Sequence, residues 1–171
     1  MCGIIGYVGR EPAVPILLAG LRRLEYRGYD SAGIAIQHNG KLEIRRSEGK
    51  LTNLEAVLHN GSIEGSTGIG HTRWATHGRP SEQNAHPHRS GEVVLVHNGI
   101  IENFLTLRHR LESEGHRFES ETDTEVIAHL LSSAMKRGSR LDEAVLQVAH
   151  DLHGSYAIAV MSLAGHRNRR R

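Results

Sequence analysis

Residues 33–46 read GIAIQHNGKLEIRR and carry the clearest fold signal in the chain. Two segments, 33–38 and 41–46, flank Asn39-Gly40, a dipeptide typical of the tight turn that joins two antiparallel strands. The stretch therefore predicts a β-hairpin, around which the rest of the chain can be placed.

Further strand and helix patterns lie on both sides of this hairpin. Residues 3–8 predict a short buried strand, and apolar residues at helical spacing follow Pro12 (Val14, Leu17, Leu18, Leu21 and Leu24). The remaining expected elements are a helix over 53–60, a strand over 67–72, a strand over 92–97 ending at Asn98-Gly99, a helix with Phe104, Leu107 and Leu111 facing inward, a helix begun by a capping box of Thr122 and Glu125, a helix over 141–152, and a buried strand over 155–163. This mixture lacks regular βαβ alternation and predicts an α+β fold.

Composition limits the classes of protein that fit. The 171 residues suit a single domain, and a formal net charge of +2 with both signs interspersed does not favour a broad nucleic-acid-binding face. No apolar run approaches the roughly 18 residues of a membrane span, and the start lacks the pattern of a signal peptide. One cysteine excludes an internal disulfide, so we expect a cytoplasmic protein.

The last residues, GHRNRRR, form a basic tail over 164–171. Its four arginines could seek phosphate, or the tail could simply be a solvated chain end. We expect it to be disordered.

Cys2 is the single cysteine and lies one residue from the start. If Met1 is removed, Cys2 carries both a thiol and a free α-amine, whose reference pKa of about 7.7–8.0 allows it to take the thiol proton. A buried small hydrophobe at the edge of a strand is the alternative. The position of Cys2 alone does not decide between a nucleophile and a buried hydrophobic residue.

Several sequence blocks decide between these alternatives: CGIIG (2–6), LEYRGYDSAGIA (24–35), HTRWATHG (71–78), NAHPH (84–88), HNGIIEN (97–103) and SETDTE (120–125). With them the chain resembles the class II glutamine amidotransferases, which are N-terminal-nucleophile hydrolases, from Cys2 to about Met161. The resemblance is greatest to glutaminase domains that feed amino-sugar phosphate synthesis. It implies a four-layer αββα sandwich, two antiparallel sheets between helical layers, and no cofactor. It also implies hydrolysis of L-glutamine to glutamate and ammonia through a γ-glutamyl thioester.

The resemblance makes Cys2 the nucleophile. It assigns the oxyanion hole to the side-chain amide of Asn98 and the backbone N–H of Gly99, groups suited to stabilise a tetrahedral oxyanion. An ordinary turn at Asn98-Gly99 is the alternative, and one turn could serve both purposes.

Substrate-binding residues also follow from the resemblance. Arg73 would bind the α-carboxylate of glutamine through its planar guanidinium, Thr76 and His77 would add contacts, and Asp123 would hold the α-ammonium. Ordinary surface charge is the alternative for Arg73 and Asp123.

Three further residues are expected to gate or support the site. Trp74 lies in a loop that would close over bound glutamine, or it could be a core aromatic. Arg27 is expected near the nucleophile, or at the surface of a helix end, and His86 is expected to help organise the site. The thirteen histidines match no structural zinc spacing, so no metal is expected.

Residues 2–163 are expected to form a type 2 glutamine amidotransferase domain that is incomplete at its C-terminal end. In the family the domain continues beyond the strand at 155–163, and sugar-phosphate isomerase domains, absent from this chain, follow. Missing strands would leave a sheet edge unpaired. A catalytically silent module that binds glutamine or a partner, or an amidotransferase domain with another acceptor, is the alternative. Full-length family members are expected to be homo-oligomers, with no nucleic-acid or membrane partner.

Overall fold

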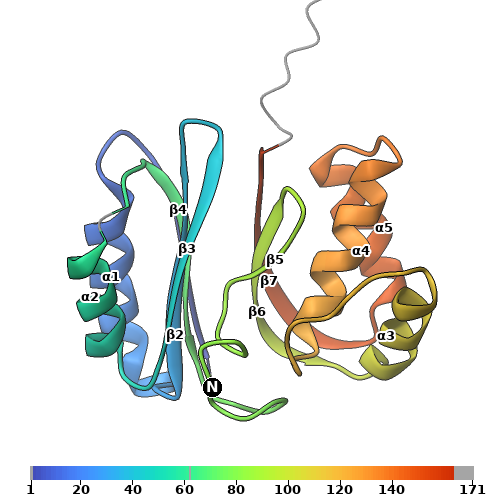
Figure 1. The fold of residues 1–171 in the computed structure, drawn as a ribbon, viewed down its shortest axis with the longest axis horizontal. Helices are drawn as coiled ribbons and strands as arrows, with labels where there is room; N and C mark the ends of the chain where they lie inside the picture. Colours follow the sequence, from blue (N-terminus) through green and yellow to red (C-terminus); the bar gives the residue numbers. More distant parts are fainter. Residues whose placement is uncertain (1, 62, 164–171) are drawn as a thin grey trace, which may run out of the picture.

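A computed structural model describes residues 2–61 and 63–163, so the expected basic tail at 164–171 lies outside the described residues. Its elements are β1 (Gly3–Val8), α1 (Ala13–Leu24), the 3₁₀ turn η1 (Glu25–Arg27), β2 (Ser31–His38), β3 (Lys41–Glu48), α2 (Leu51–Asn60), β4 (Thr67–Arg73), β5 (His88–Ser90), β6 (Val93–Ile101), α3 (Phe104–Ser113), α4 (Thr124–Lys136), α5 (Leu141–Asp151) and β7 (Gly154–Ser162). Two sheets lie face to face, with α1 and α2 outside one and α3, α4 and α5 outside the other (Figure 1). The expected α+β, four-layer αββα arrangement is confirmed.

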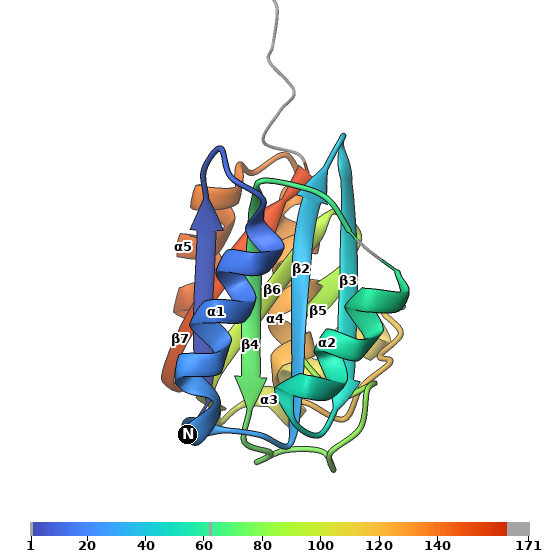
Figure 2. The ribbon, with the colours of Figure 1, turned by 90° about the vertical axis from the view of Figure 1, so that its left-hand side faces the viewer.

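The first sheet has the strand order β1-β4-β2-β3, and every pairing is antiparallel. The predicted hairpin forms its β2–β3 pair, with Asn39 and Gly40 at φ values of 46° and 72° in the turn. Helix α1 packs on β1 and β4, while α2 packs on β3 (Figure 2). This sheet carries the start of the chain, and therefore Cys2, to one end of the sandwich.

The second sheet has the order β5-β6-β7, again antiparallel. Strand β6 does not end at Asn98-Gly99 as expected but continues through both residues, which pair with Ala157 and Tyr156 of β7. The turn interpretation of this dipeptide is wrong, because pairing with a strand from far along the chain outweighs a local turn preference.

Apolar residues fill the three spaces between the four layers. The space between the sheets holds Ala35, Leu42, Ile69, Val94, Val96 and Met161. One outer space includes Leu17, Leu21, Ile34, Ile36 and Leu54, and the other includes Leu95, Ile127, Leu131, Ala134 and Val148. Packing on both faces of each sheet fixes how the strand ends of one sheet sit against those of the other.

The structure corrects three local expectations. Strands β1 and β7 are largely half-buried or exposed rather than buried, because each is an edge strand in the described part of the chain. The capping box of Thr122 and Glu125 does not form: the Glu125 carboxylate instead accepts the backbone N–H groups of Glu119 and Ser120 at 2.8 and 2.7 Å. The loop before α4 is therefore held by Glu125.

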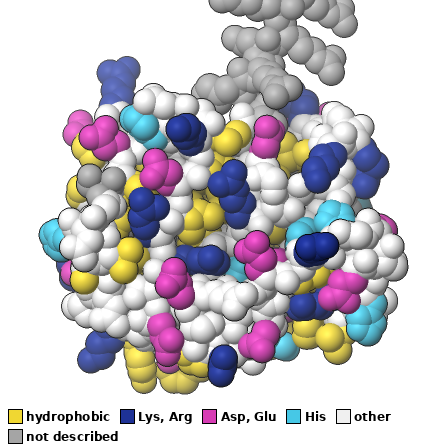
Figure 3. Space-filling view, viewed as in Figure 1, with side chains coloured by type: hydrophobic (Ala, Val, Ile, Leu, Met, Phe, Trp, Pro, Cys, Tyr) yellow, Lys and Arg dark blue, Asp and Glu magenta, His cyan; other side chains and the backbone are white. Residues whose placement is uncertain are grey.

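Surface charge and helix lengths agree with the composition. Acidic and basic side chains are interspersed over the face shown in Figure 3, without a large patch of one sign. Across the described residues, no helix combines the length and the apolar character needed to cross a membrane.

Candidate active site

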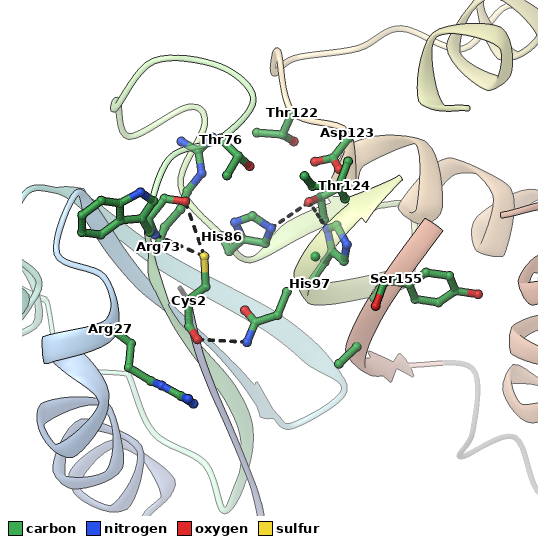
Figure 4. Close-up of a pocket in the computed structure, with 16 residues that line it drawn as sticks. Cys2, Arg27, Arg73, Thr76, His86, His97, Thr122, Asp123, Thr124 and Ser155 are labelled. Carbon is green, nitrogen blue, oxygen red and sulfur yellow. Dashed lines mark hydrogen bonds between the residues drawn. The ribbon is translucent and has the colours of Figure 1, made fainter. Parts of the chain in front are cut away.

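A cavity of about 570 Å³ lies where the start of β1 and the end of β4 meet the end of β6 and the start of β7 (Figure 4). Nine of the ten residues expected at the site line it: Cys2, Arg27, Arg73, Trp74, Thr76, His86, Asn98, Gly99 and Asp123. The exception is His77. The cavity thus gathers residues that are far apart in sequence.

Cys2 is placed by the register of β1 against β4, which pairs Gly3 with Thr72 and so brings Cys2 beside Arg73 and Trp74. The Trp74 backbone N–H donates to the Cys2 sulfur at 3.2 Å, and the thiol faces the Trp74 carbonyl at 3.5 Å. Burial raises the pKa of the Cys2 thiol above its ordinary value, although the Trp74 N–H and the Arg73 charge oppose this. The thiol is therefore protonated at neutral pH, and nucleophilic attack requires a base.

The segment RGYD at 27–30 supports the end of β4 beside Cys2. A side chain at Gly28 would lie 2.7 Å from the Arg73 carbonyl carbon, so the close approach of these two backbones requires glycine. The Asp30 carboxylate accepts the Ala75 N–H at 2.9 Å, which holds the chain after β4. Arg27 borders the cavity from η1, and its buried Nε has no partner in the described structure.

Asn98 faces Cys2 across the gap between the sheets. Its Nδ2 donates to the Cys2 carbonyl oxygen at 3.1 Å, and its Oδ1 lies 2.9 Å from His71 Nε2. Gly99 follows at a φ of 126°, and a side chain there would lie 2.2 Å from the Ser155 carbonyl oxygen of β7. Glycine is therefore required at the point where β6 passes the cavity.

Arg73 is buried at the end of β4. Its Nη2 donates to the carbonyl oxygens of His77 and Gly78, the latter at 3.1 Å. Its buried Nη1 has no partner within residues 2–61 and 63–163, and the Arg73 side chain borders the cavity. The surface-charge alternative is wrong for this residue, which is 3% exposed.

Asp123 lies just before α4 and is 4% exposed, so it too is not ordinary surface charge. One carboxylate oxygen accepts the Ile101 N–H at 2.9 Å, which anchors the end of β6. Asp123 and Arg73 reach the cavity from different elements, so a buried anion and a buried cation border the same space (Figure 4). This pair can bind a zwitterion.

The remaining expected residues occupy different settings. Trp74 is 46% exposed, so the core-aromatic alternative is wrong, and its ring packs edge-on against Tyr29 at 5.8 Å. Thr76 lines the cavity from the exposed loop. The His77 side chain does not line it, since the ring packs against Phe104 at 5.1 Å and only the His77 carbonyl contacts Arg73. The predicted contact of His77 with glutamine stays a prediction.

Around the predicted His86, sequence reasoning missed three buried polar residues: His97 and Thr124, which line the cavity, and His71 beside them. His86 Nε2 and His97 Nδ1 both hydrogen-bond to Thr124 Oγ1, at 2.8 and 2.9 Å. His71 stacks on His86 with ring centroids 4.1 Å apart. Burial lowers the pKa of His71 to about 3 and that of His86 well below its usual range, so both are neutral. The sequence signal that could have identified the buried histidines is a histidine inside an otherwise apolar strand pattern.

Other cavity residues missed were Ile100, Thr122, Ser155, Tyr156 and Ala157. The structure shows no cluster of three or more potential metal ligands among residues 2–61 and 63–163.

Comparisons with known proteins show the family of the chain. A family model described as a glutamine amidotransferase domain matches residues 71–170. The chain is 59% identical over 161 residues to the glutamine–fructose-6-phosphate aminotransferase [isomerizing] of Zymomonas mobilis, and 55% identical over 161 residues to that of Brucella suis. Each alignment covers 94% of this chain and 26% of the relative, so the chain spans about a quarter of their length.

Solved structures share the fold. The glutamine phosphoribosylpyrophosphate amidotransferase from B. subtilis, complexed with ADP and GMP, superposes with a TM-score of 0.79 at 32% identity, covering 95% of this chain and 35% of that chain. A structure described as the allosteric regulatory enzyme of purine biosynthesis superposes with a TM-score of 0.80 at 33% identity, covering 95% of this chain and 36% of that chain.

Proposed function

The chain belongs to the glutamine amidotransferase family, and from this premise we propose that residues 2–163 hydrolyse L-glutamine to glutamate and ammonia, with Cys2 as the nucleophile. The observation that carries the proposal is one cavity bordered by a thiol, a buried cation, a buried anion and a carboxamide, namely Cys2, Arg73, Asp123 and Asn98. A zwitterionic amino acid with an amide tail matches these four groups.

Substrate recognition uses the two ends of glutamine. The α-carboxylate meets Arg73, whose Nη1 has no partner in the described residues and whose Nη2 is held by two backbone carbonyls. The α-ammonium meets Asp123, held by the Ile101 N–H. Thr76 and Arg27 border the same space, and His86 supports its inner wall through Thr124.

The loop over 73–79, which includes Trp74, closes over bound glutamine and excludes water. The indole ring of Trp74 is exposed and Trp74 directly follows Arg73, and both features suit this role.

Catalysis begins when the Cys2 sulfur attacks the amide carbon of glutamine. The raised thiol pKa means that the proton leaves during attack, and the α-amine of Cys2, exposed once Met1 is removed, accepts it. The tetrahedral oxyanion accepts hydrogen bonds from Asn98 Nδ2 and the Gly99 N–H. One such donor contributes about 2.7–4 kcal/mol of barrier lowering in comparable sites.

Collapse of this intermediate completes the reaction. The carbon–nitrogen bond breaks, the protonated amine returns its proton to the leaving nitrogen, and ammonia departs. Water then attacks the γ-glutamyl thioester, giving up a proton through the same amine, and releases glutamate while the thiol is reformed. No cofactor enters this scheme.

The ammonia is destined for amino-sugar phosphate synthesis. Two relatives named glutamine–fructose-6-phosphate aminotransferase are 55–59% identical to this chain, against 32–33% for the two solved structures. We assign the acceptor reaction to isomerase domains outside this chain, in a homo-oligomeric protein. A free catalytic thiol suits the reducing cytoplasm.

The test is covalent labelling joined to turnover. A glutamine-like diazoketone should add one adduct, located by mass spectrometry on the N-terminal peptide, and intact mass should show that Met1 has been removed. The parent should release ammonia from glutamine, while Cys2→Ala should not. A Cys2→Ala variant as active as the parent refutes the proposal. Glutamine binding without adduct or ammonia would instead support the silent binding module.

A further inference from the structure

His71 is a buried histidine of β4 that faces the second sheet. It is 1% exposed, and its Nε2 lies 2.9 Å from Asn98 Oδ1 and 3.1 Å from the His97 carbonyl oxygen. The His97 carbonyl can only accept a hydrogen bond, so Nε2 must carry the ring proton. The side chain is therefore a donor pointed at the Asn98 amide.

The Asn98 amide has only one orientation that satisfies both of its neighbours. The Cys2 carbonyl, 3.1 Å away, can only accept, so the nitrogen of the amide must face Cys2. The Nε2–H of His71 can only donate, so the oxygen must face His71. Two backbone carbonyls, those of Cys2 and His97, thus fix the same arrangement independently.

The protonation state of His71 keeps this arrangement constant. Burial lowers the pKa of its imidazole to about 3, so the ring is neutral at working pH and its single proton stays on Nε2. The other ring nitrogen, Nδ1, is buried without a partner in the described residues, and the His86 ring stacks on the imidazole at 4.1 Å.

We propose that His71 is a positioning residue for glutamine hydrolysis, which holds Asn98 Oδ1 so that the amide N–H₂ faces the nucleophile. The inference rests on the proposed function. Without this bond the Cys2 carbonyl is the one described group that still holds the amide, and a flipped amide would present an oxygen to the developing oxyanion in place of a donor. The residue acts through Asn98 and does not touch the substrate.

The first test compares two substitutions of His71. His71→Leu removes the donor and should lower kcat for ammonia release by about 10- to 100-fold, below the 10²–10³-fold effect of losing a complete oxyanion donor, with KM changed less than about threefold. His71→Gln, whose amide nitrogen can replace Nε2–H, should recover most of that loss. His129→Leu removes another buried histidine, on α4 outside the cavity, and should leave kcat unchanged.

A double-mutant cycle separates positioning from general structural damage. In an Asn98→Ala background, His71→Leu should cost less than about threefold, because the group it orients is gone. An equal loss of kcat in both backgrounds overturns the inference, as does a His71→Leu variant that keeps the parent kcat.

A second measurement does not depend on turnover or on the stability of a variant. ¹⁵N NMR of the parent should show the His71 ring as the neutral tautomer protonated at Nε2 between pH 5 and 8. A proton on Nδ1, or an imidazolium, overturns the inference. A parent that releases no ammonia and takes no label at Cys2 refutes the proposed function itself, which is a different result.

Discussion

Replacing Asp123 by asparagine should weaken glutamine binding while leaving the fold intact. The Asp123 carboxylate accepts the buried Ile101 N–H at 2.9 Å, and an asparagine oxygen can accept the same bond. What disappears is the negative charge offered to the α-ammonium. Hydrogen bonds to charged groups contribute about 1.5–3 kcal/mol, which corresponds to a rise in the KM for glutamine of roughly 10- to 150-fold.

Asp123→Ala should add a folding defect to the same binding defect. It leaves the Ile101 N–H buried without an acceptor, which costs about 1–3 kcal/mol in the free energy of unfolding. The asparagine variant should stay within about 1 kcal/mol of the parent. The difference between the two variants therefore separates the structural hydrogen bond from the charge.

The assay measures glutamate formation against glutamine concentration, with urea unfolding of each variant at the same pH. Glu121→Gln is the matched control, since Glu121 is a nearby exposed acid that does not line the cavity. If Asp123→Asn changes KM by less than about threefold, or Glu121→Gln raises it equally, Asp123 does not bind the ammonium group.

Three other predictions follow from the buried site. Burial lowers the pKa of His71, His86 and His88, to about 3 for the first and last, so each gains a proton on unfolding in acid. The stability that these neutral histidines contribute is therefore present in full above about pH 6.5 and is lost as the pH falls toward 3. His71 and His88 each cost about 2 kcal/mol by pH 5, and urea unfolding that loses under 1 kcal/mol in total contradicts this. Since burial raises the thiol pKa of Cys2 in the chain that retains Met1, the alkylation rate of that chain by iodoacetamide should still increase above pH 9, and a plateau below pH 8 would contradict the raised pKa. Gly99→Ala places a side chain 2.2 Å from a β7 carbonyl oxygen at a φ of 126° and should reduce the free energy of unfolding by about 3 kcal/mol or more; a thermal midpoint equal to the parent's is the contrary result.

Sequence patterns within one helix or hairpin were sufficient to predict its structure where local chemistry decides the conformation. The turn at Asn39-Gly40 needs two residues with positive φ, and this pair supplies them at little cost. Helix α1 follows from apolar residues on one face, two of which, Leu17 and Leu21, are fully buried. In both cases the deciding interactions lie within a few residues of one another.

The predictions that were wrong share a different cause, namely contacts made outside the local element. Asn98-Gly99 has the composition of a turn, yet β7 arrives from more than fifty residues later and converts it into paired strand. Glu125 has the spacing of a capping residue, yet its carboxylate accepts hydrogen bonds from the backbone N–H groups of Glu119 and Ser120 instead. A single chain position cannot reveal a partner that only the tertiary fold brings near.

The same reasoning explains why His71 escaped sequence analysis although it lies inside a quoted block. Its role depends on the distance between two sheets, since His71 and Cys2 belong to the first and Asn98 to the second. Any slide of one sheet over the other would move the carboxamide away from the nucleophile and break both of its hydrogen bonds together. The apolar layer between the sheets, with Ile69 and Val96 among its members, therefore sets the geometry of the reaction as well as the stability of the fold.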